Sequence, residues 1–285
     1  MGESEEADHP CLSEMTHVKA VRSLPMDSAR IVDLYRYPVK GLSPERLAEA
    51  QLRTGDHFPG DRLYAIENGP SGFDPAQPAF QPKTRFLMLM KNERLALLRT
   101  RFVDAERKLI VTPPDAAPVE FDLGSPDGRA KVEAFFALYC AEELRGRPRL
   151  LEAGGSFRFT DSARSGFVSL LNLSSVKELG EKAGTVLDPL RFRANVHLDG
   201  WPAWQEVSLV GKIITIGSTR LEVLKPIDRC LATHVDPTSG VRDVDVVGTL
   251  RRTYGHIECG IYARVLTGGK ITPGDEIAPE PDLFG

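Results

Sequence analysis

A cysteine at position 230 has the setting of a reactive group. The segment PIDRCLATHVDPTSG places Cys230 directly after Arg229 and just behind an apolar run. A neighbouring guanidinium favours the thiolate, which is the form that binds metals and attacks electrophiles. A turn follows, as Asp236, Pro237 and Gly240 indicate. Residues between the end of a strand and a loop often belong to binding or catalytic sites. Three roles are open for Cys230 on this basis: metal ligand, nucleophile or core residue.

A zinc site is one alternative for this region. Cys230, His234, His256 and Cys259 form C-x3-H followed by H-x2-C, and zinc takes such ligands in tetrahedral sites. Structural zinc sites usually have tighter spacing, and HIECGIYARVL places Cys259 at the start of an apolar strand pattern. The spacing therefore favours loop positions for both histidines and a core position for Cys259.

Several common catalytic motifs are absent from the sequence. The 285 residues contain no GxxxxGKS/T, GxGxxG, GxSxG, HExxH or CxxC. Their absence argues against nucleotide-dependent transfer, serine hydrolysis, zinc peptidase chemistry and an iron–sulfur centre. Lys and Arg number 36 against 40 Asp and Glu, for a net charge of −4. Nucleic-acid binding usually leaves a basic excess, so no nucleic-acid partner is expected.

Cysteine use and hydropathy predict a cytoplasmic protein with free thiols. The four cysteines, Cys11, Cys140, Cys230 and Cys259, show no close pairing, and a chain of this size needs no disulfide framework. No window approaches 18 consecutive apolar residues, so no membrane span is expected. Residues 1–29 are polar, lack the apolar segment of a secretory signal and predict a disordered leader.

The elements that must position Cys230 are mainly short strands. Apolar patterns between turn residues predict early strands at 31–35, 47–52, 62–67, 86–90, 95–100 and 108–112. A Gly- and Pro-rich stretch over 69–84 predicts a long loop. Short strands at this spacing indicate a β-barrel or sandwich-like subdomain.

Apolar residues at three- and four-residue intervals predict an amphipathic helix over 129–146, with Cys140 on its apolar face in the core. Further expected elements are a helix at 173–184 and strands at 194–198, 212–217, 221–224 and 260–266. The fold class is therefore α+β and predominantly β. We divide the chain into a leader (1–29), a β domain (30–128), a bridging helix (129–147), an α+β domain (148–279) and a tail (280–285).

The segment IDRCLATHVDPTSGVRD, followed by TLRRTYG, resembles the signature of MOSC-domain proteins. That family includes the C-terminal domain of molybdenum cofactor sulfurase and the mitochondrial amidoxime reducing component. IVDLYRYPVKGLSPE, LRFRANVHLDG and ITPGDEI are similar to other family segments in the same order, so the resemblance covers about residues 30–279. It implies an N-terminal β-barrel module followed by a MOSC β-barrel with flanking helices.

The resemblance also implies a set of site residues. Cys230 lies where the reductase branch of the family ligates molybdenum. Asp236 is implied as an orienting residue or proton relay, with a simple turn residue as the alternative. Gly41 lies where those reductases often have serine, which removes one phosphate hydroxyl. The implied pterin, phosphate and thiolate contacts are Lys40, Gly41, Arg62, Asn172, Ser175, Arg193, Asn195 and Arg229.

The activity implied by the resemblance is reduction of an N-hydroxylated or N-oxide small molecule by oxygen-atom removal at a Cys-ligated molybdenum cofactor. The chain lacks ferredoxin-type cysteines, so we expect an external haem or iron–sulfur protein, with its reductase, as electron donor. Pyridoxal phosphate is associated with this family only through its sulfurase branch. The alternative is a carrier that binds the molybdenum cofactor or sulfur without turnover.

Overall fold

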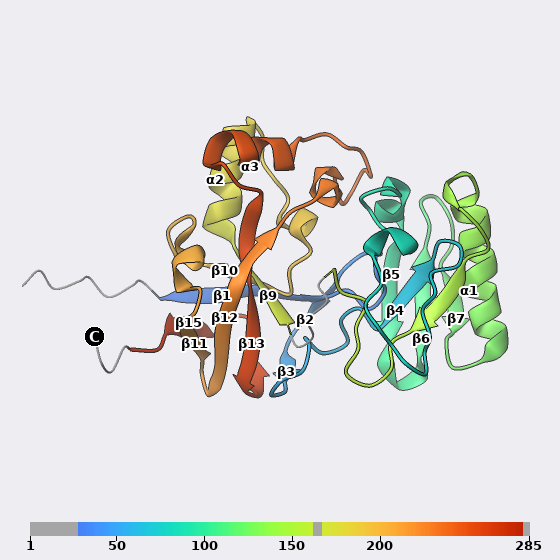
Figure 1. Cartoon of the computed structure of the whole chain (residues 1–285), viewed down its shortest axis with the longest axis horizontal. Coiled ribbons are helices and arrows are strands. Elements are labelled where there is room, and N and C mark those ends of the chain that lie inside the picture. The colour runs from blue at the N-terminus through green and yellow to red at the C-terminus, as the bar shows by residue number, and fades with distance from the viewer. Residues whose placement is uncertain (1–27, 162–166, 282–285) are drawn as a thin grey trace, which may run out of the picture.

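The computed structural model describes residues 28–161 and 167–281, and they form two lobes (Figure 1). A β-barrel makes up one lobe, and a smaller group of strands with the helix α1 makes up the other. The expected leader at 1–29 lies outside the described residues except for its last two positions. Most of the expected tail at 280–285 lies outside them as well.

The barrel consists of seven strands, and an eighth extends it at one edge. In spatial order the strands are β10 (Val196–Asp199), β9 (Phe167–Asn172), β13 (Glu258–Thr267), β12 (Thr219–Asp228), β11 (Ile213–Ile216), β15 (Glu276–Pro279), β1 (Ala29–Arg36) and β2 (Glu45–Leu47). Pairing of β1 with β10 closes the barrel. The pair β9–β10 is parallel, whereas the other pairs are antiparallel.

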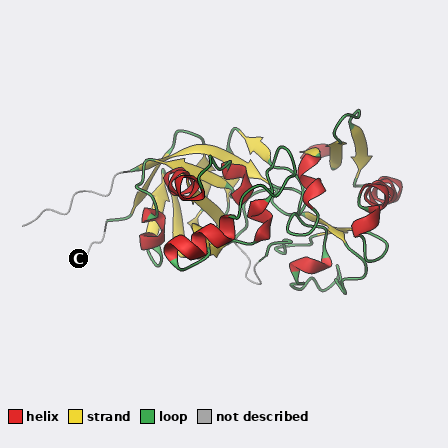
Figure 2. Cartoon of the chain, turned by 90° about the horizontal axis from the view of Figure 1, so that it is seen from above, coloured by secondary structure: helices red, strands yellow, loops and turns green. Residues whose placement is uncertain are grey.

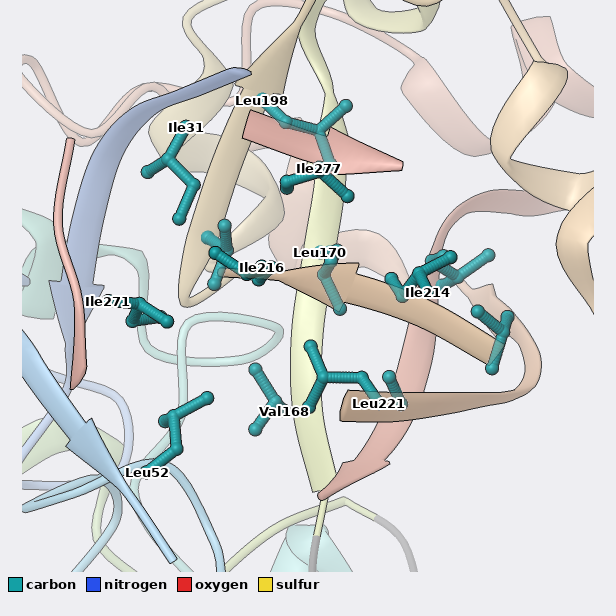
Figure 3. Close-up of a cluster of buried hydrophobic side chains, with 14 of the residues drawn as sticks. Ile31, Leu52, Val168, Leu170, Leu198, Ile214, Ile216, Leu221, Ile271 and Ile277 are labelled. Atoms are coloured by element: carbon teal, nitrogen blue, oxygen red, sulfur yellow. The ribbon is translucent and has the colours of Figure 1, made fainter. Parts of the chain in front are cut away.

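Alternation along these strands separates the barrel interior from its outer wall. Val168 and Leu170 are buried in the interior core, together with Ile31 and Leu198 from the strands that close the barrel (Figure 3). Ile261 of β13 belongs to the same core. Successive side chains of a strand point to opposite faces. The residues between these apolar positions therefore face outward, and on β9, β12 and β13 they form the wall of the cavity described below.

Strand β1 belongs to the barrel of the C-terminal part of the chain. We expected residues 31–35 to form a strand of the N-terminal domain, but Ala29 pairs with Ile277 and Ile31 with Leu198. The alternating apolar residues of β1 predict the strand itself, whereas its partners lie far along the chain. A local pattern carries no information about such distant pairing.

The second lobe has its own apolar core. Its strands are β4 (Tyr64–Glu67), β8 (Arg149–Glu152), β5 (Arg99–Val103), β6 (Lys108–Thr112) and β7 (Val119–Asp122). Strands β5–β6–β7 form one antiparallel sheet, and β4–β8 form another. A separate pair, β3 (Ala50–Leu52) with β14 (Gly269–Ile271), connects the early chain to the barrel strands.

Helix α1 (Pro126–Tyr139) covers this second core. Ser125 caps its first turn by accepting from the amide of Gly128 at 3.1 Å, and Cys140 ends it as a buried residue, as expected from its apolar face. The structure differs from the expected bridging role, because α1 packs on β7 and β8 at the far side of this lobe (Figure 1). Its apolar face contributes Val132 and Phe136 to the lobe core.

Two further helices lie together over one end of the barrel (Figures 1 and 2). Helix α2 (Leu173–Ala183) was expected, whereas α3 (Val246–Tyr254) was not. The strand expected at 86–90 is a turn, because the Asn92 side chain accepts from the amide of Met88 at 3.0 Å. Short 3-10 turns are η1 (Lys83–Arg85), η2 (Glu93–Leu97), η3 (Asp104–Glu106), η4 (Ala141–Glu143), η5 (Pro189–Phe192), η6 (Gln205–Leu209) and η7 (Leu231–His234).

Within residues 28–161 and 167–281, none of the helices combines the length and the apolar character needed to cross a bilayer.

Candidate functional site

A cavity of about 350 Å³ lies between the two lobes. The outer faces of β9, β12 and β13 form one wall, with Phe167, Lys225 and Tyr262. The segments after β1 and around η1 form the other wall, with Lys40 and Lys83. The volume falls within the range of small-molecule and cofactor sites.

The cavity is strongly basic. Seven of its lining residues are Lys or Arg, and three are Asp. Because the acidic residues are fewer, the lining has a positive excess that favours an anionic ligand. The basic residues are Lys40, Arg62, Lys83, Arg191, Arg193, Lys225 and Arg229, and the acidic ones are Asp61, Asp161 and Asp228.

Cys230 lies in the cavity lining at the end of β12. It is partly exposed and precedes the 3-10 turn η7, where Thr233 donates to the Cys230 carbonyl through its amide at 3.0 Å and its hydroxyl at 2.9 Å. The other cysteines of the described residues, Cys140 and Cys259, are buried, and burial raises the pKa of each thiol to about 12. Of these three thiols, Cys230 is therefore the one placed for chemistry.

Arg229 orders the backbone around Cys230. Its guanidinium donates to the carbonyl of Phe192 at 2.7 Å and, through Nε, to the carbonyl of Cys259 at 2.7 Å. It also lies over the Phe192 ring, 5.2 Å from the centroid. Burial lowers the pKa of Arg229, and these bonds to carbonyl oxygens hold the guanidinium in place. Gly260, at φ +75°, leaves room for this side chain, because a Cβ there would lie 3.0 Å from Nη2.

Two arginines from different lobes meet over one tyrosine. The guanidinium carbons of Arg62 and Arg193 lie 5.0 Å and 4.3 Å from the centroid of the Tyr37 ring. Arg62 donates to the Arg193 carbonyl at 3.1 Å and forms an ion pair with Asp61, which also accepts from the Tyr37 amide at 2.8 Å. Both arginines have positive φ, at 50° and 52°. Non-glycine residues in that conformation cluster at functional sites.

The Tyr37 hydroxyl is buried and has no hydrogen-bond partner among the described residues. Burial raises the pKa of Tyr37, so the group remains a neutral hydroxyl. Burial lowers the pKa of Arg193 to about 10. Buried polar groups nearly always have a partner. Tyr37 is fully buried behind the two guanidiniums, whereas Arg62 and Arg193 themselves line the cavity and can reach an anionic ligand.

Lys40 forms the inner part of the same basic wall. Its ammonium donates to the Phe159 carbonyl at 3.0 Å and pairs with Asp161. Burial lowers the pKa of Lys40, and the Asp161 charge opposes that shift. Lys83 lies on the outer side, with Nζ 3.5 Å from Asp161 Oδ2. Burial lowers the pKa of Lys83, but Asp161 and Cys230 outweigh that effect and raise it.

The Asp161 carboxylate makes the free energy of unfolding depend on pH in the acidic range. Burial raises its pKa, but Lys40 and Lys83 outweigh this and hold it well below the ordinary value of 3.8. A depressed folded-state pKa contributes stability above the unfolded value and loses it as the pH falls. We expect Asp161→Asn to lower the free energy of unfolding at pH 7 by about 1–2 kcal/mol, because the Lys40 charge loses its partner.

The measurement is chemical unfolding of cofactor-free protein between pH 7 and pH 2.5. Wild type should lose stability below about pH 4, while Asp161→Asn should change less in that window. Parallel acid profiles for the two proteins would contradict the role of this ion pair.

Asn195 and Gly41, two further residues predicted to contact the cofactor, also line the cavity. The Asn195 side chain accepts from the Ser169 hydroxyl at 2.7 Å and donates to the Tyr35 carbonyl at 3.1 Å. It therefore ties β9, β10 and β1 together at the cavity wall and has one amide hydrogen left. Gly41 has φ +84°, and a Cβ there would lie 2.9 Å from the Leu87 carbonyl oxygen. Its backbone forms part of the lining.

Asn172 and Ser175 are not part of the cavity lining. Asn172 caps helix α2 and donates to Glu206 at 3.0 Å, and the Ser175 hydroxyl donates to the same carboxylate at 2.7 Å. All three side chains are fully buried. Burial raises the pKa of Glu206, and these donors oppose that effect. The two residues therefore anchor α2 to η6 and make no contact with the cavity.

Asp236 also lies outside the lining. Its Oδ1 accepts from the amides of Thr238 and Ser239 at 3.0 Å and 2.7 Å, as in a turn. Its Oδ2 accepts from Arg191 at 2.9 Å, and Arg191 lines the cavity and also pairs with Asp243 at 2.8 Å. Asp236 thus holds the loop after Cys230 and positions Arg191. The turn alternative describes this placement better than a proton relay.

We expect Asp236→Asn to have a small effect. The amide oxygen can still accept the turn hydrogen bonds, and Arg191 keeps Asp243. Stability should fall by about 1 kcal/mol, and turnover should stay within about twofold of wild type. Loss of a general acid or base usually costs about 10² to 10⁴ in rate. Turnover would be measured by steady-state kinetics and folding by circular dichroism. A decrease in turnover of that size in a folded Asp236→Asn protein would support the proton relay instead.

The zinc alternative is not supported by the geometry. Among the residues that the structure describes, no group of three or more His, Cys, Asp and Glu is placed to hold a metal. His234 Nε2 accepts from the Val247 amide at 3.2 Å, and His256 Nδ1 accepts from the Glu258 amide at 3.1 Å. Cys259 is a buried core residue, as expected.

Several residues that line the cavity were not predicted from the sequence. Lys83 begins the short 3-10 turn η1, Asp161 lies in a segment without helix or strand, and Tyr262 is one aromatic position in β13. Met88 and Met90 follow the long Gly- and Pro-rich loop and add apolar surface near Cys230. A lone charge or methionine in a loop has many ordinary explanations, so no spacing rule identifies these residues.

Comparisons with known proteins identify two family domains in the chain. The MOSC N-terminal beta barrel domain matches residues 28–141, and the MOSC domain matches residues 160–278. These matches agree with the resemblance seen in the sequence.

The curated relatives of this chain have low sequence identity to it. The chain is 24% identical over 281 residues to a molybdenum cofactor sulfurase of Caenorhabditis elegans, covering 89% of this chain and 36% of that protein. A molybdenum cofactor sulfurase of Drosophila pseudoobscura pseudoobscura is 34% identical over 96 residues, covering 33% and 12%. The chain thus spans about a third or less of the length of these relatives.

Among solved structures, the YUAD protein from Bacillus subtilis is similar with a TM-score of 0.44 and 16% identity, over 88% of this chain and 94% of that one. YiiM from Geobacillus stearothermophilus has a TM-score of 0.31 and 21% identity, over 41% and 56%.

Proposed function

From the premise that this chain is a MOSC-domain protein with a MOSC N-terminal β-barrel domain, we propose that it binds a molybdenum cofactor and reduces N-hydroxylated or N-oxide small molecules. The observation that supports this proposal most is one partly exposed thiol, Cys230, in an inter-lobe cavity with a basic lining. A soft ligand and an anion-binding wall thus share one cavity. A pterin cofactor with a dithiolene-bound metal and a phosphate needs both.

The residues present fit such a group. A cysteine thiolate is a soft metal ligand, and Cys230 can provide one from a strand end. Arg62 and Arg193 offer forks of donors that match phosphate oxygens. Both arginines line the cavity and pack against the buried Tyr37 ring, which fixes their position. Asn195 retains a donor for a pterin edge.

When bound, the cofactor would supply the two-electron chemistry that removes an oxygen atom from the substrate nitrogen. The chain's own residues would bind and orient. Arg229 holds the backbone at Cys230 through two carbonyls, so that the thiol keeps its direction. The Lys40–Asp161 pair keeps one charge of the basic wall neutralised. The reaction consumes two electrons and two protons and releases water.

We also propose an external electron donor. In the part of the chain that the structure describes, the cysteines are single residues without a second cysteine ligand nearby for an iron–sulfur cluster. A haem or iron–sulfur protein with its reductase would therefore supply the electrons.

The test is purification from a host that makes the cofactor, followed by molybdenum and pterin analysis. Reduction of an N-hydroxylated amidine would then be assayed with a chemically reduced viologen dye. We expect about one molybdenum and one pterin per chain, turnover with the dye and none with NADH alone. Turnover with NADH alone would contradict the external donor. Bound cofactor without any N-reduction, together with transfer to a second protein, would replace the reductase with a carrier.

A further inference from the structure

One arginine joins the two sides of the cavity next to Cys230. The Arg242 guanidinium donates to the Leu231 carbonyl at 2.9 Å, directly after Cys230. The same group donates to the carbonyls of Leu89 at 3.0 Å and Met90 at 2.8 Å, which belong to the other lobe. Glu93 accepts a further bond from it at 3.1 Å. Four acceptors from two lobes therefore depend on a single side chain.

The loop that carries Arg242 is itself well anchored. The backbone bridge between Val235 and Arg242 folds the segment back on the turn after Cys230. Arg99 of the second lobe donates to the Pro237 carbonyl at 3.0 Å, which gives a second link between the lobes. Arg242 thus reaches the other lobe from a fixed base.

The segment that Arg242 holds is an apolar wall. Met88, Leu89 and Met90 line the cavity, as do Ala232 and Ile227 on the Cys230 side. The charged lining residues Arg62, Arg193 and Lys40 come from other elements of the cavity. Methionine is flexible and polarisable, so such a wall adapts to different apolar groups. The cavity therefore has an apolar part at residues 88–90, while Lys83 and Arg229 keep basic groups next to Cys230.

We propose that residues 88–90 form the binding surface for the hydrocarbon body of the substrate, and that Arg242 is the positioning residue that holds this surface against the Cys230 loop. The first part deepens the function proposed above and rests on it, because it names an N-hydroxylated substrate with an aromatic or alkyl body. The second part rests only on the four hydrogen bonds.

Arginine is required for this arrangement because its planar fork can donate in several directions at once. A lysine would keep the charge, but one ammonium cannot reach three carbonyls from this geometry. Loss of even one hydrogen bond from a charged donor is enough to change an opening equilibrium about tenfold, which corresponds to about 1.4 kcal/mol. Loss of the fork should therefore open the 88–92 segment measurably more often.

Hydrogen exchange of the cofactor-free protein tests the positioning role. The amides of Lys91 and Asn92 donate to the Met88 carbonyl at 3.0 Å and 2.8 Å, so they report on this segment. In Arg242→Lys and Arg242→Ala we expect exchange of these amides at least about tenfold faster, with α1 unchanged. Arg264→Ala is the matched control, because Arg264 forms an exposed ion pair with Glu222. Unchanged exchange at Lys91 and Asn92 would overturn the positioning role.

Binding of a ligand pair tests the apolar surface. The probes are two neutral N-hydroxylated amidines, one with a phenyl group and one with a methyl group, titrated into cofactor-loaded protein without an electron donor. Burial of the additional apolar area should make the phenyl probe bind about tenfold tighter to wild type. This preference should fall several-fold in Met90→Gln and in Arg242→Lys and persist in Arg264→Ala, with equal molybdenum content in all four proteins.

The two proposals fail in different ways. Molybdenum and pterin bound to wild type, with no preference for the phenyl probe, would overturn the apolar surface and leave the proposed function standing. No molybdenum in wild type from a competent host would overturn the proposed function, while the exchange experiment would still decide the role of Arg242.

Discussion

Replacement of Cys230 by alanine is expected to remove molybdenum from the protein while pterin and fold are retained. The thiol is the soft ligand that we propose for the metal, and its loss leaves the basic residues that would hold pterin and phosphate in place. Metal content by mass spectrometry should fall at least about tenfold from about one per chain, because the metal would lose the side-chain ligand that we propose for it and keep only the pterin dithiolene. N-hydroxy reduction should be lost with it.

Cys140→Ala provides the matched control, because Cys140 is a buried thiol in the other lobe. It should lose stability by about 1–2 kcal/mol through the cavity that it leaves, and it should keep molybdenum. Full molybdenum content in Cys230→Ala, with a native circular dichroism spectrum, would show that Cys230 is not the ligand.

Replacement of Arg193 by alanine is expected to reduce the pterin content at least about tenfold. Arg193 is one of two guanidiniums stacked on Tyr37, and each charged hydrogen bond to a phosphate contributes about 1.5–3 kcal/mol. Arg62→Ala should have a similar effect and should also lower stability, because it removes the ion pair with Asp61. Pterin would be measured as its oxidised fluorescent product after purification.

Arg264→Ala again serves as the control for loss of one positive charge, and it should retain pterin. Arg193→Lys should retain part of the pterin, since a lysine offers a point charge without the fork. Equal pterin content in Arg193→Ala, Arg62→Ala and wild type would place the anionic group elsewhere in the cavity.

The predominantly β character of the fold follows from the sequence, whereas several elements do not. The strand expected at 108–112 is β6 with the same bounds, because a short apolar run of Leu, Ile and Val stands between charged residues and turn residues. Strand β9 was missed because all six of its residues are buried and its pattern does not alternate. The apolar run at 86–90 predicted a strand, but its residues are apolar because they line the core and the cavity. Burial alone does not specify the backbone conformation.

The candidate site was predicted in part. The family segments led to Cys230, Arg193 and Asn195, which the structure places in one cavity. Asn172 and Ser175 are polar residues at a helix start, where a capping role and a ligand contact have the same sequence signature. Contacts between lobes, such as those of Arg242, depend on how distant segments meet. The sequence around Arg242 therefore gave no indication of its partners.

The closure of the barrel by β1 has a consequence for synthesis on the ribosome. Ala29 pairs with Ile277, so β1 must wait for roughly 250 further residues before its last partner exists. At about 5–20 residues per second this delay is roughly 10–50 s. During that time the apolar side chains of Ile31 and Leu34 lack the interior that buries them. Because the chain after β1 forms one wall of the cavity, the cavity takes its final shape only when translation is nearly complete.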